Sequence, residues 1–240
     1  MKITINGNDI TNGRIVGGGY SSAELKKVDE TKRNKAEGIS KIKVESDCAN
    51  VTVSTINSTD AKEPYYGEAY VEAHYFGEAY TDGKPELNVT TSGDELIITA
   101  TTKAHVVNGS LKLNVRIPPR VFRSISVKSQ NGSVGICKEV EAKRLRIDSQ
   151  NGRIISEATF EEISAKSMNG SIDICTRAKN DIEVNASSMN GSVFVELENI
   201  GSCNFSTSSM NGTVRNKKHS TGRYKATGEI SSMNGDVKIW

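Results

Sequence analysis

The residue types that most often carry chemistry are few and widely spaced in this chain of 240 residues. Cysteines and histidines that bind a metal or act as nucleophile and base usually show short spacings such as Cys-x-x-Cys. No such spacing occurs among His74, His105, His219, Cys48, Cys137, Cys175 and Cys203. Polysaccharide cleavage needs paired carboxyl groups on one face, but Asp148, Asp173 and Asp236 fall at different positions of the repeat described below. We therefore expect no catalytic site, no metal and no other cofactor.

Methionine, in contrast, is placed regularly. Met168, Met189, Met210 and Met233 each stand between a serine and an asparagine in a repeated sequence. The serine is expected to face inward, so the methionines should point outward. Methionine is adaptable and common at permissive binding surfaces, and an exposed apolar stripe often marks an interface. Two interpretations stay open: the stripe binds a partner, or a loop or the N-terminal half covers it.

Aromatic residues concentrate between positions 65 and 80, where YGEAY and FGEAY recur ten residues apart. Aromatic side chains at this density can stack on sugars or anchor a protein partner. The alternative is an exposed strand pair that simply packs on a sheet. The candidate interaction residues in this segment are Tyr66, Tyr70, Tyr75, Phe76 and Tyr80.

The strongest pattern is a repeat, Ser-(Gln/Met)-Asn-Gly-x-(Val/Ile), present in six copies at intervals of 18 to 23 residues. Asn-Gly between strands often forms a tight hairpin. Identical residues at the same point of each repeat instead favour stacked coils, in which every position neighbours its own equivalent. Stacked asparagines can then bond along their column, and glycine gives each corner a backbone shape that other residues resist. The predicted corner column comprises Asn131, Gly132, Asn151, Gly152, Asn169, Gly170, Asn190, Gly191, Asn211, Gly212, Asn234 and Gly235.

Strands with one buried face must position these corners, because apolar and small residues alternate with polar ones on both sides of each Asn-Gly. The sequence predicts an all-β fold: a β-solenoid or β-roll of about six coils over residues 119–240, preceded by an antiparallel β-meander over 39–118 that caps it. Residues 1–38 should hold short β pieces and a charged linker or loose helix. The last coil ends at Lys238-Ile239-Trp240 without an evident cap, so its strand should form an open end.

Composition narrows the possible partners. The formal net charge is +2 and mean hydropathy is −0.45, so there is no basic field of the kind that attracts nucleic acid. No apolar run approaches signal-peptide or membrane-helix length. We expect a soluble, cytoplasmic protein without direct membrane insertion, the alternative being association with the cell envelope through a partner.

With the six repeats, the Val115-Arg116-Ile117-Pro118 strand end before them, and the earlier strands Ile42-Lys43-Val44-Glu45 and Glu95-Leu96-Ile97-Ile98, the chain resembles the bacterial putative-adhesin family over about residues 39–240. The resemblance implies a β-solenoid or β-roll fold and brings no catalytic residues. It also implies a neighbourhood of membrane or envelope-stress genes.

Two hypotheses about function follow. In the first, the chain is a non-catalytic, adhesin-like binding or scaffold module that presents the methionine column or the tyrosine-rich segment to a protein or a glycan. In the second, it is a structural protein that associates with copies of itself end to end, because an open coil is a strand template.

Overall fold

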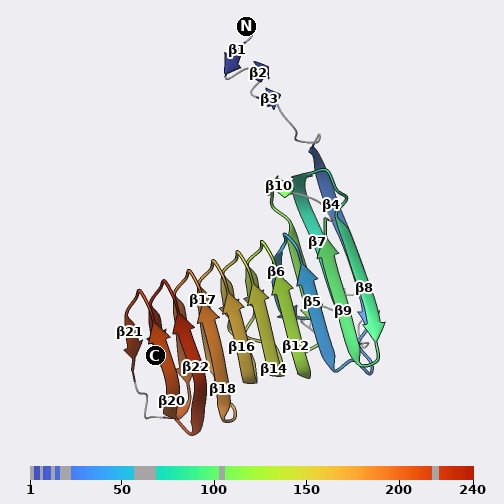
Figure 1. The fold of residues 1–240 in the computed structure, drawn as a ribbon. Coiled ribbons are helices and arrows are strands. Elements are labelled where there is room, and N and C mark those ends of the chain that lie inside the picture. The colour runs from blue at the N-terminus through green and yellow to red at the C-terminus, as the bar shows by residue number, and fades with distance from the viewer. Residues whose placement is uncertain are drawn as a thin grey trace.

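The computed structural model describes residues 3–5, 8–11, 14–16, 23–56, 69–102, 106–217 and 222–240. Within these residues all regular structure is β, as predicted, and it forms two large sheets and one small one (Figure 1). The described part of the chain holds no helix of the length and apolarity needed to span a membrane.

The nine-stranded sheet is parallel except at one edge, where its last strand runs antiparallel to its neighbour. Its strands, in spatial order, are β20 (Ile200–Ser209), β22 (Tyr224–Ser232), β18 (Ile182–Ser188), β16 (Thr159–Ser167), β14 (Glu141–Ser149), β12 (Val121–Ser129), β5 (Lys41–Ser46), β9 (Glu95–Thr101) and β8 (Glu86–Ser92).

The eleven-stranded sheet is mixed: it is parallel from β11 to β21, whereas β7 pairs antiparallel with β4, β10 and β11. Its main path, with β4 (Glu24–Lys35) attached to β7, is β10 (Val106–Gly109), β7 (Tyr70–Thr81), β11 (Lys112–Ile117), β6 (Asn50–Thr55), β13 (Val134–Ile136), β15 (Ile154–Ser156), β17 (Ile172–Arg177), β19 (Val193–Glu198), β23 (Val237–Ile239) and β21 (Val214–Asn216). A separate antiparallel sheet contains β1 (Ile3–Ile5), β2 (Asn8–Thr11) and β3 (Arg14–Val16).

Each Asn-Gly corner carries the chain from the nine-stranded sheet into the eleven-stranded one. Neighbouring strands pair in register, so that Ile125 lies beside Leu145, which lies beside Ile163. All three are buried, and full burial of such a side chain stabilises a fold by about 1.5–3 kcal/mol. The core therefore runs between the two sheets, with the alternate residues of every strand facing it.

The order of the strands departs from the sequence at the C-terminal end. The sixth repeat forms β22 and β23, and these strands lie between β18 and β20 and between β19 and β21. The prediction that the strand ending at Ile239 and Trp240 is open is therefore wrong. The edge strands at this end are β20 and β21, from the fifth repeat, and Figure 1 shows them at the left of the molecule.

The same rearrangement occurs near the N-terminal end and corrects the predicted meander. β5 pairs in parallel with β9 and β12, and β6 pairs in parallel with β11 and β13. Antiparallel pairing over residues 39–118 is confined to β7, β8 and β10 with their neighbours. Both sheets continue across residue 118, so the boundary drawn at Pro118-Pro119 divides the chain and not the sheets.

Residues 24–35 form the twelve-residue strand β4, not the predicted linker or loose helix. Charged residues occupy both faces of this strand, so the alternation of apolar and polar residues that marks a strand is missing. The strand is instead held by ion pairs with β7, such as the one between Lys27 Nζ and Glu78 Oε1 at 2.8 Å. Opposite charges facing each other on neighbouring strands stabilise the pairing.

Candidate functional site

The asparagine side chains of the corners form one continuous hydrogen-bonded ladder. Each Asn Nδ2 donates to the Oδ1 of the asparagine on the neighbouring strand, at 2.7 or 2.8 Å. The order along the ladder is Asn131, Asn151, Asn169, Asn190, Asn234 and Asn211. Its first member donates to the carbonyl oxygen of Asp47 at 3.2 Å. All the amides point the same way, so the ladder ends at Asn211 with its Oδ1 on the outermost corner.

The corner glycines are required by close packing between corners. A Cβ atom at Gly152 would lie 2.1 Å from the carbonyl oxygen of Gly132, and one at Gly170 would lie 2.1 Å from that of Gly152. None of these corner glycines has a positive φ. The predicted reason, a backbone shape that other residues resist, is therefore wrong: the glycines are there because the backbones nearly touch.

The corner serines satisfy backbone groups as well as filling space. The hydroxyl oxygen of Ser129 accepts the N–H of Gly132 at 3.0 Å, and Ser149 does the same for Gly152. The Ser149 hydroxyl also donates to the carbonyl oxygen of Gly132 at 3.4 Å. Asparagine, glycine and serine thus act together as a structural corner.

A seventh corner of this kind lies at residues 46–49, where the repeat sequence is absent. The hydroxyl oxygen of Ser46 accepts the N–H of Ala49 at 2.9 Å. The sequence feature that marks this corner is the alternation of apolar and polar residues in the strand before it, since Ile42-x-Val44-x-Ser46 matches Ile125-x-Val127-x-Ser129. A search for Asn-Gly alone misses it, since Ala49 replaces the glycine.

The methionines stand side by side on the surface, one per corner, in the spatial order Met168, Met189, Met233, Met210. We call these four residues the methionine row. Their exposed fractions are 47%, 42%, 42% and 73%. No described loop covers them, and the N-terminal strands lie at the other end of the sheets.

A shallow groove of about 1030 Å³ runs beside the methionine row on the outer face of the nine-stranded sheet. Next to three of the methionines its lining is a row of serines that occupy one register position, Ser187, Ser231 and Ser208. Further along, the same register position carries alternating charges, on Lys166, Asp148, Lys128 and Glu45. The groove therefore has an uncharged part bordered by methionine and a charged part.

The described residues of the tyrosine-rich segment do not form an aromatic surface. Tyr70 and Tyr75 are buried in β7, whereas Tyr80 is 49% exposed. Phe76 is half-buried, and its ring stacks on that of His74 with 4.4 Å between the ring centroids. Tyr66 lies outside the described residues. From Tyr70 onward the segment belongs to one long strand, β7, between β4 and β11, and not to the expected exposed strand pair.

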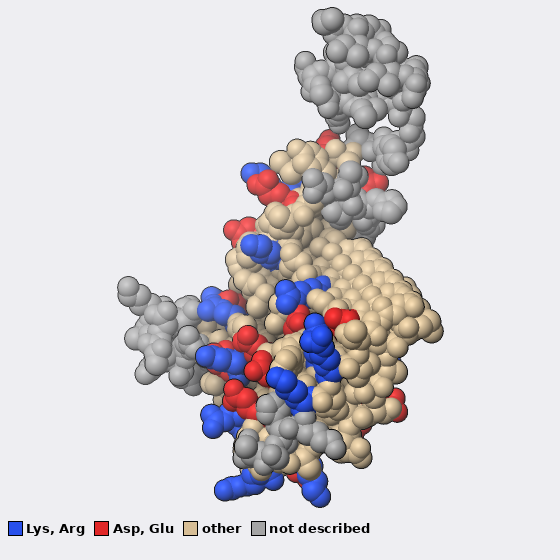
Figure 2. Space-filling model, turned by 90° about the vertical axis from the view of Figure 1, so that its left-hand side faces the viewer, with Lys and Arg blue, Asp and Glu red and all other residues tan. Residues whose placement is uncertain are grey.

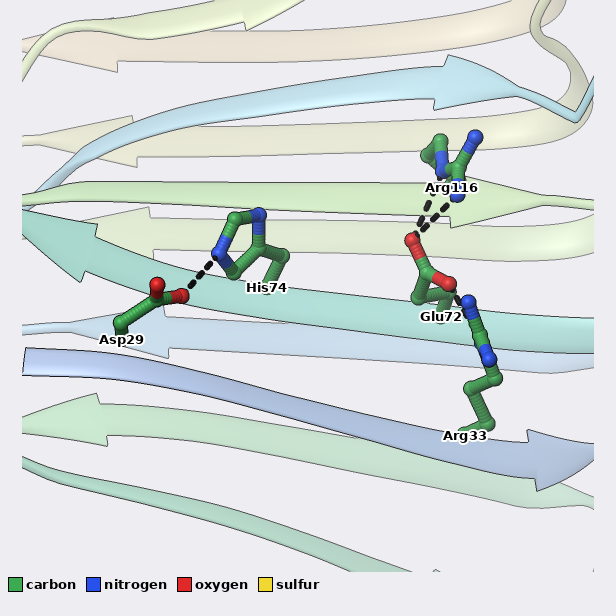
Figure 3. Close-up of polar contacts among 5 residues, drawn as sticks. All are labelled: Asp29, Arg33, Glu72, His74 and Arg116. Carbon is green, nitrogen blue, oxygen red and sulfur yellow. Dashed lines mark hydrogen bonds and ion pairs between the residues drawn. The ribbon is translucent and has the colours of Figure 1, made fainter.

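A compact cluster of charges is centred on Glu72 (Figure 3). The carboxylate of Glu72, on β7, accepts hydrogen bonds from Nε of Arg116 on β11 at 2.8 Å and from Nε of Arg33 on β4 at 2.5 Å. Burial acts to raise the pKa of Glu72, but the two arginines outweigh it and hold that pKa below its ordinary value. Three strands are thereby joined by an ion cluster, which is a structural role.

The cysteine thiols are poorly suited to nucleophilic chemistry, which needs a lowered pKa. Burial is the main factor that raises the pKa of Cys48 to about 12 and that of Cys175 to about 11. It also raises the pKa values of Cys137 and Cys203. Among the described residues, histidine, cysteine, aspartate and glutamate form no group that could hold a metal ion. His74 pairs with Asp29 at 2.8 Å, and His105 and His219 lie outside those residues.

No family model matches this chain, and no curated protein matches it. Solved structures do. One is described as a putative cell adhesion protein from Clostridium sporogenes: it is 12% identical, the alignment covers 89% of this chain and 99% of that one, and the TM-score is 0.54. A putative adhesin from Bacteroides fragilis is 15% identical, with 91% and 98% of the two chains covered and a TM-score of 0.46. At these identities the likeness is one of fold.

Proposed function

We propose that this protein is a non-catalytic binding module whose partner surface is the methionine row with the uncharged groove beside it. The observation that carries the proposal is the exposure of four methionines on adjacent corners, each 42% or more. Unbranched thioether side chains adjust to varied shapes, and a contiguous exposed apolar stripe is typical of an interaction site. The small serines leave the methionines accessible from the side.

The partner we propose is a protein. A glycan is favoured by several exposed aromatic rings that stack on sugar faces, but among the described residues of the tyrosine-rich segment Tyr70 and Tyr75 are buried and Tyr80 alone is exposed. The methionine row suits apolar side chains instead, and the neighbouring Lys128, Asp148 and Lys166 can orient a partner by charge.

The fold supports this role as a rigid scaffold. We infer that the parallel strands form a β-solenoid with about six repeat coils, closed at one end by the antiparallel strands β4, β7, β8 and β10. In-register pairing of equivalent residues from β12 to β22 supports this interpretation. The names of the structural neighbours agree with an adhesin-like role, and we infer association with the cell envelope through a partner.

Photo-crosslinking tests the proposal, because four of the five methionines belong to the row. Protein labelled with photo-methionine should crosslink to a partner through the row. The purified partner should then bind the Met189→Glu and Met233→Glu variants at least about tenfold more weakly than wild type. Val121→Glu is the matched control, since Val121 is 57% exposed on β12 and lies outside the groove.

Equal affinity of the partner for wild type and both variants would remove the methionine row from the proposal. Binding on a glycan array that survives both substitutions would change the class of partner.

A further inference from the structure

We infer that this chain forms a two-fold dimer by joining the β20 end of its sheets to the same end of a second copy. The inference is independent of the binding function proposed above. It rests on how differently the two ends of the nine-stranded sheet are built.

Among the described residues, the β20 edge over residues 202–209 lacks the devices that normally protect a sheet edge, and the only irregularity in its pairing with β22 lies between Ile200 and Ser202. Natural edge strands carry lysine, proline, a bulge or a covering segment that blocks pairing with another chain. The ten residues of β20, Ile200–Ser209, include no charged residue and no proline. Among the described residues, no strand pairs with its outer side.

The backbone of β20 is ready for a further strand. The N–H of Met210 donates to the carbonyl oxygen of Ser232 at 3.2 Å, so the even-numbered residues direct their backbone groups toward β22. Alternate residues of a strand bond to opposite sides. The odd-numbered residues Cys203, Phe205 and Thr207 therefore direct their N–H and C=O groups toward the open side.

Side chains of the core are also left partly uncovered at this end. Cys203, Phe205 and Thr207 face inward and are only half-buried, whereas Ala226 and Ile230 on the neighbouring strand are fully buried. On the other sheet Val214 is 41% exposed, although its neighbour Val237 is buried. Figure 2 looks from this side of the molecule and shows Lys, Arg, Asp and Glu side chains gathered near the middle of the view, with a broad uncharged area to their right.

The opposite edge, β8, is protected by charged side chains of β4. The N–H of Leu87 donates to the Glu30 carboxylate at 3.3 Å, and the Lys32 ammonium donates to the Leu87 carbonyl oxygen at 2.5 Å. Backbone groups that would otherwise pair with a new strand are thereby occupied. One end can associate and the other cannot, so assembly stops at two copies and no fibre grows.

A second copy fits the β20 end better than a single peptide strand does. The end presents two sheet edges, β20 and β21, with the core between them. A single peptide strand can pair with only one of these edges, whereas a second copy of the chain supplies partner strands for both β20 and β21. With β20 antiparallel to its copy, no like charges face each other across the strand pair, because β20 has none.

Sedimentation or light scattering of the full chain from about 1 μM to about 0.5 mM tests the inference. The weight-average mass should rise and level off at twice 26.0 kDa. Thr207→Lys places a charge on the uncovered core, and Thr207→Pro removes an N–H that the monomer does not use. Each should weaken dimerisation at least about tenfold. Thr91→Lys is the matched control: Thr91 is an exposed threonine on the protected edge strand β8, and its substitution should leave the dimer unchanged.

Circular dichroism and thermal unfolding of each variant establish that it is folded, and Thr207→Pro decides the matter if Thr207→Lys does not fold. Amide exchange supplies a readout on wild type alone, since exchange in β20 should slow as concentration rises. A wild-type mass that stays at 26.0 kDa throughout overturns the inference. So does a mass that keeps rising past two copies, or a dimer that Thr91→Lys disrupts and folded Thr207 variants do not.

Discussion

At the scale of single residues, the corners show that one repeated residue can be constrained by its neighbour on the next strand. Gly170 has no special φ, yet the backbone of Gly152 occupies the space where a Cβ would be. The asparagines are joined in the same direction, so each amide both donates and accepts a hydrogen bond along the ladder, except Asn211, which only donates. The sequence alone identifies the corner asparagines and glycines because they recur. The contacts that require these residues lie between one repeat and the next and are seen only in the structure.

Gly170→Ala should therefore destabilise the fold by about 2–4 kcal/mol, since overlap with backbone atoms can be relieved only by moving the stacked corners apart. Gly135→Ala is the matched control. Its Cβ would meet only the carbonyl oxygen of Val51, at 4.0 Å, and stability should change little. Urea unfolding of both variants measures the difference. Equal stabilities would show that the corners separate at little cost.

Glu72 predicts a dependence of stability on pH. Its pKa is lowered in the folded protein from the ordinary value of 4.5. The stabilisation is therefore fully present above pH 4.5, and it is lost as pH falls through the lower, folded-state pKa. Unfolding free energies measured at descending pH should fall less steeply for Glu72→Gln than for wild type. Glu161→Gln, at an exposed position, is the control and should follow wild type. Parallel curves for wild type and Glu72→Gln would contradict the role of this carboxylate.

At the scale of elements, the inward-facing residues of the fifth and sixth repeats differ, as their positions at the edge and in the interior of the sheets require. β20, at the edge, turns Cys203, Phe205 and Thr207 inward, whereas β22, in the interior, turns Ala226 and Ile230 inward to full burial. The more polar Thr207, which pairs with Ile230, suits the less covered position.

The fifth repeat should depend entirely on the sixth. Within the described residues β20 pairs only with β22, and β21 pairs only with β23. A chain that stops at Gly222 should lose structure in residues 200–216 as well, and limited proteolysis followed by mass spectrometry should find new cleavage sites there. Removal of residues 1–22 is the control, because β1, β2 and β3 pair only with one another. Resistance of residues 200–216 in the truncated chain would refute the dependence.

Most of the parallel strands could be predicted from the sequence, because alternation of apolar and polar residues identifies a strand and a fixed repeat aligns it with its equivalents. The sequence predicts strands within β5, β9 and β11, but it does not predict their parallel pairing, since the Asn-Gly marker is absent there. β4 escaped prediction because both its faces are charged. The exchange of β20 and β22 also escaped, because both carry the same repeat and either order satisfies the register.

The candidate site was predictable to the same degree. The outward direction of Met189 and its equivalents follows from the position between an inward serine and a corner asparagine. The burial of Tyr75 does not follow from its own segment, because it depends on β4 and β11, which lie far away in the sequence.

At the scale of the whole molecule, the two ends differ in protection. Antiparallel strands and charged side chains close one end, and the other consists of strands with one neighbour each. In a stack of repeats, stability is shared between nearest neighbours, so end strands open most readily.

Hydrogen exchange should show this asymmetry. In the Thr207→Lys variant, studied at a concentration at which its mass is that of a monomer, amide protection should be highest in β14 and β16 and should decline toward β20 and β21. It should decline much less toward β5 and β9. Exchange followed by mass spectrometry of peptides from each strand measures the profile. A symmetrical profile would show that the strands at the closed end add no protection.

The interior place of β22 and β23 has a consequence for how the chain is made. Residues 224–239 leave the ribosome after residues 200–216, yet their position between β18 and β20 must be free when they arrive. The earlier segment therefore has to wait without its neighbour, or step outward by one strand spacing. In either case residues 224–239 complete the two sheets from within, between strands that were made before them.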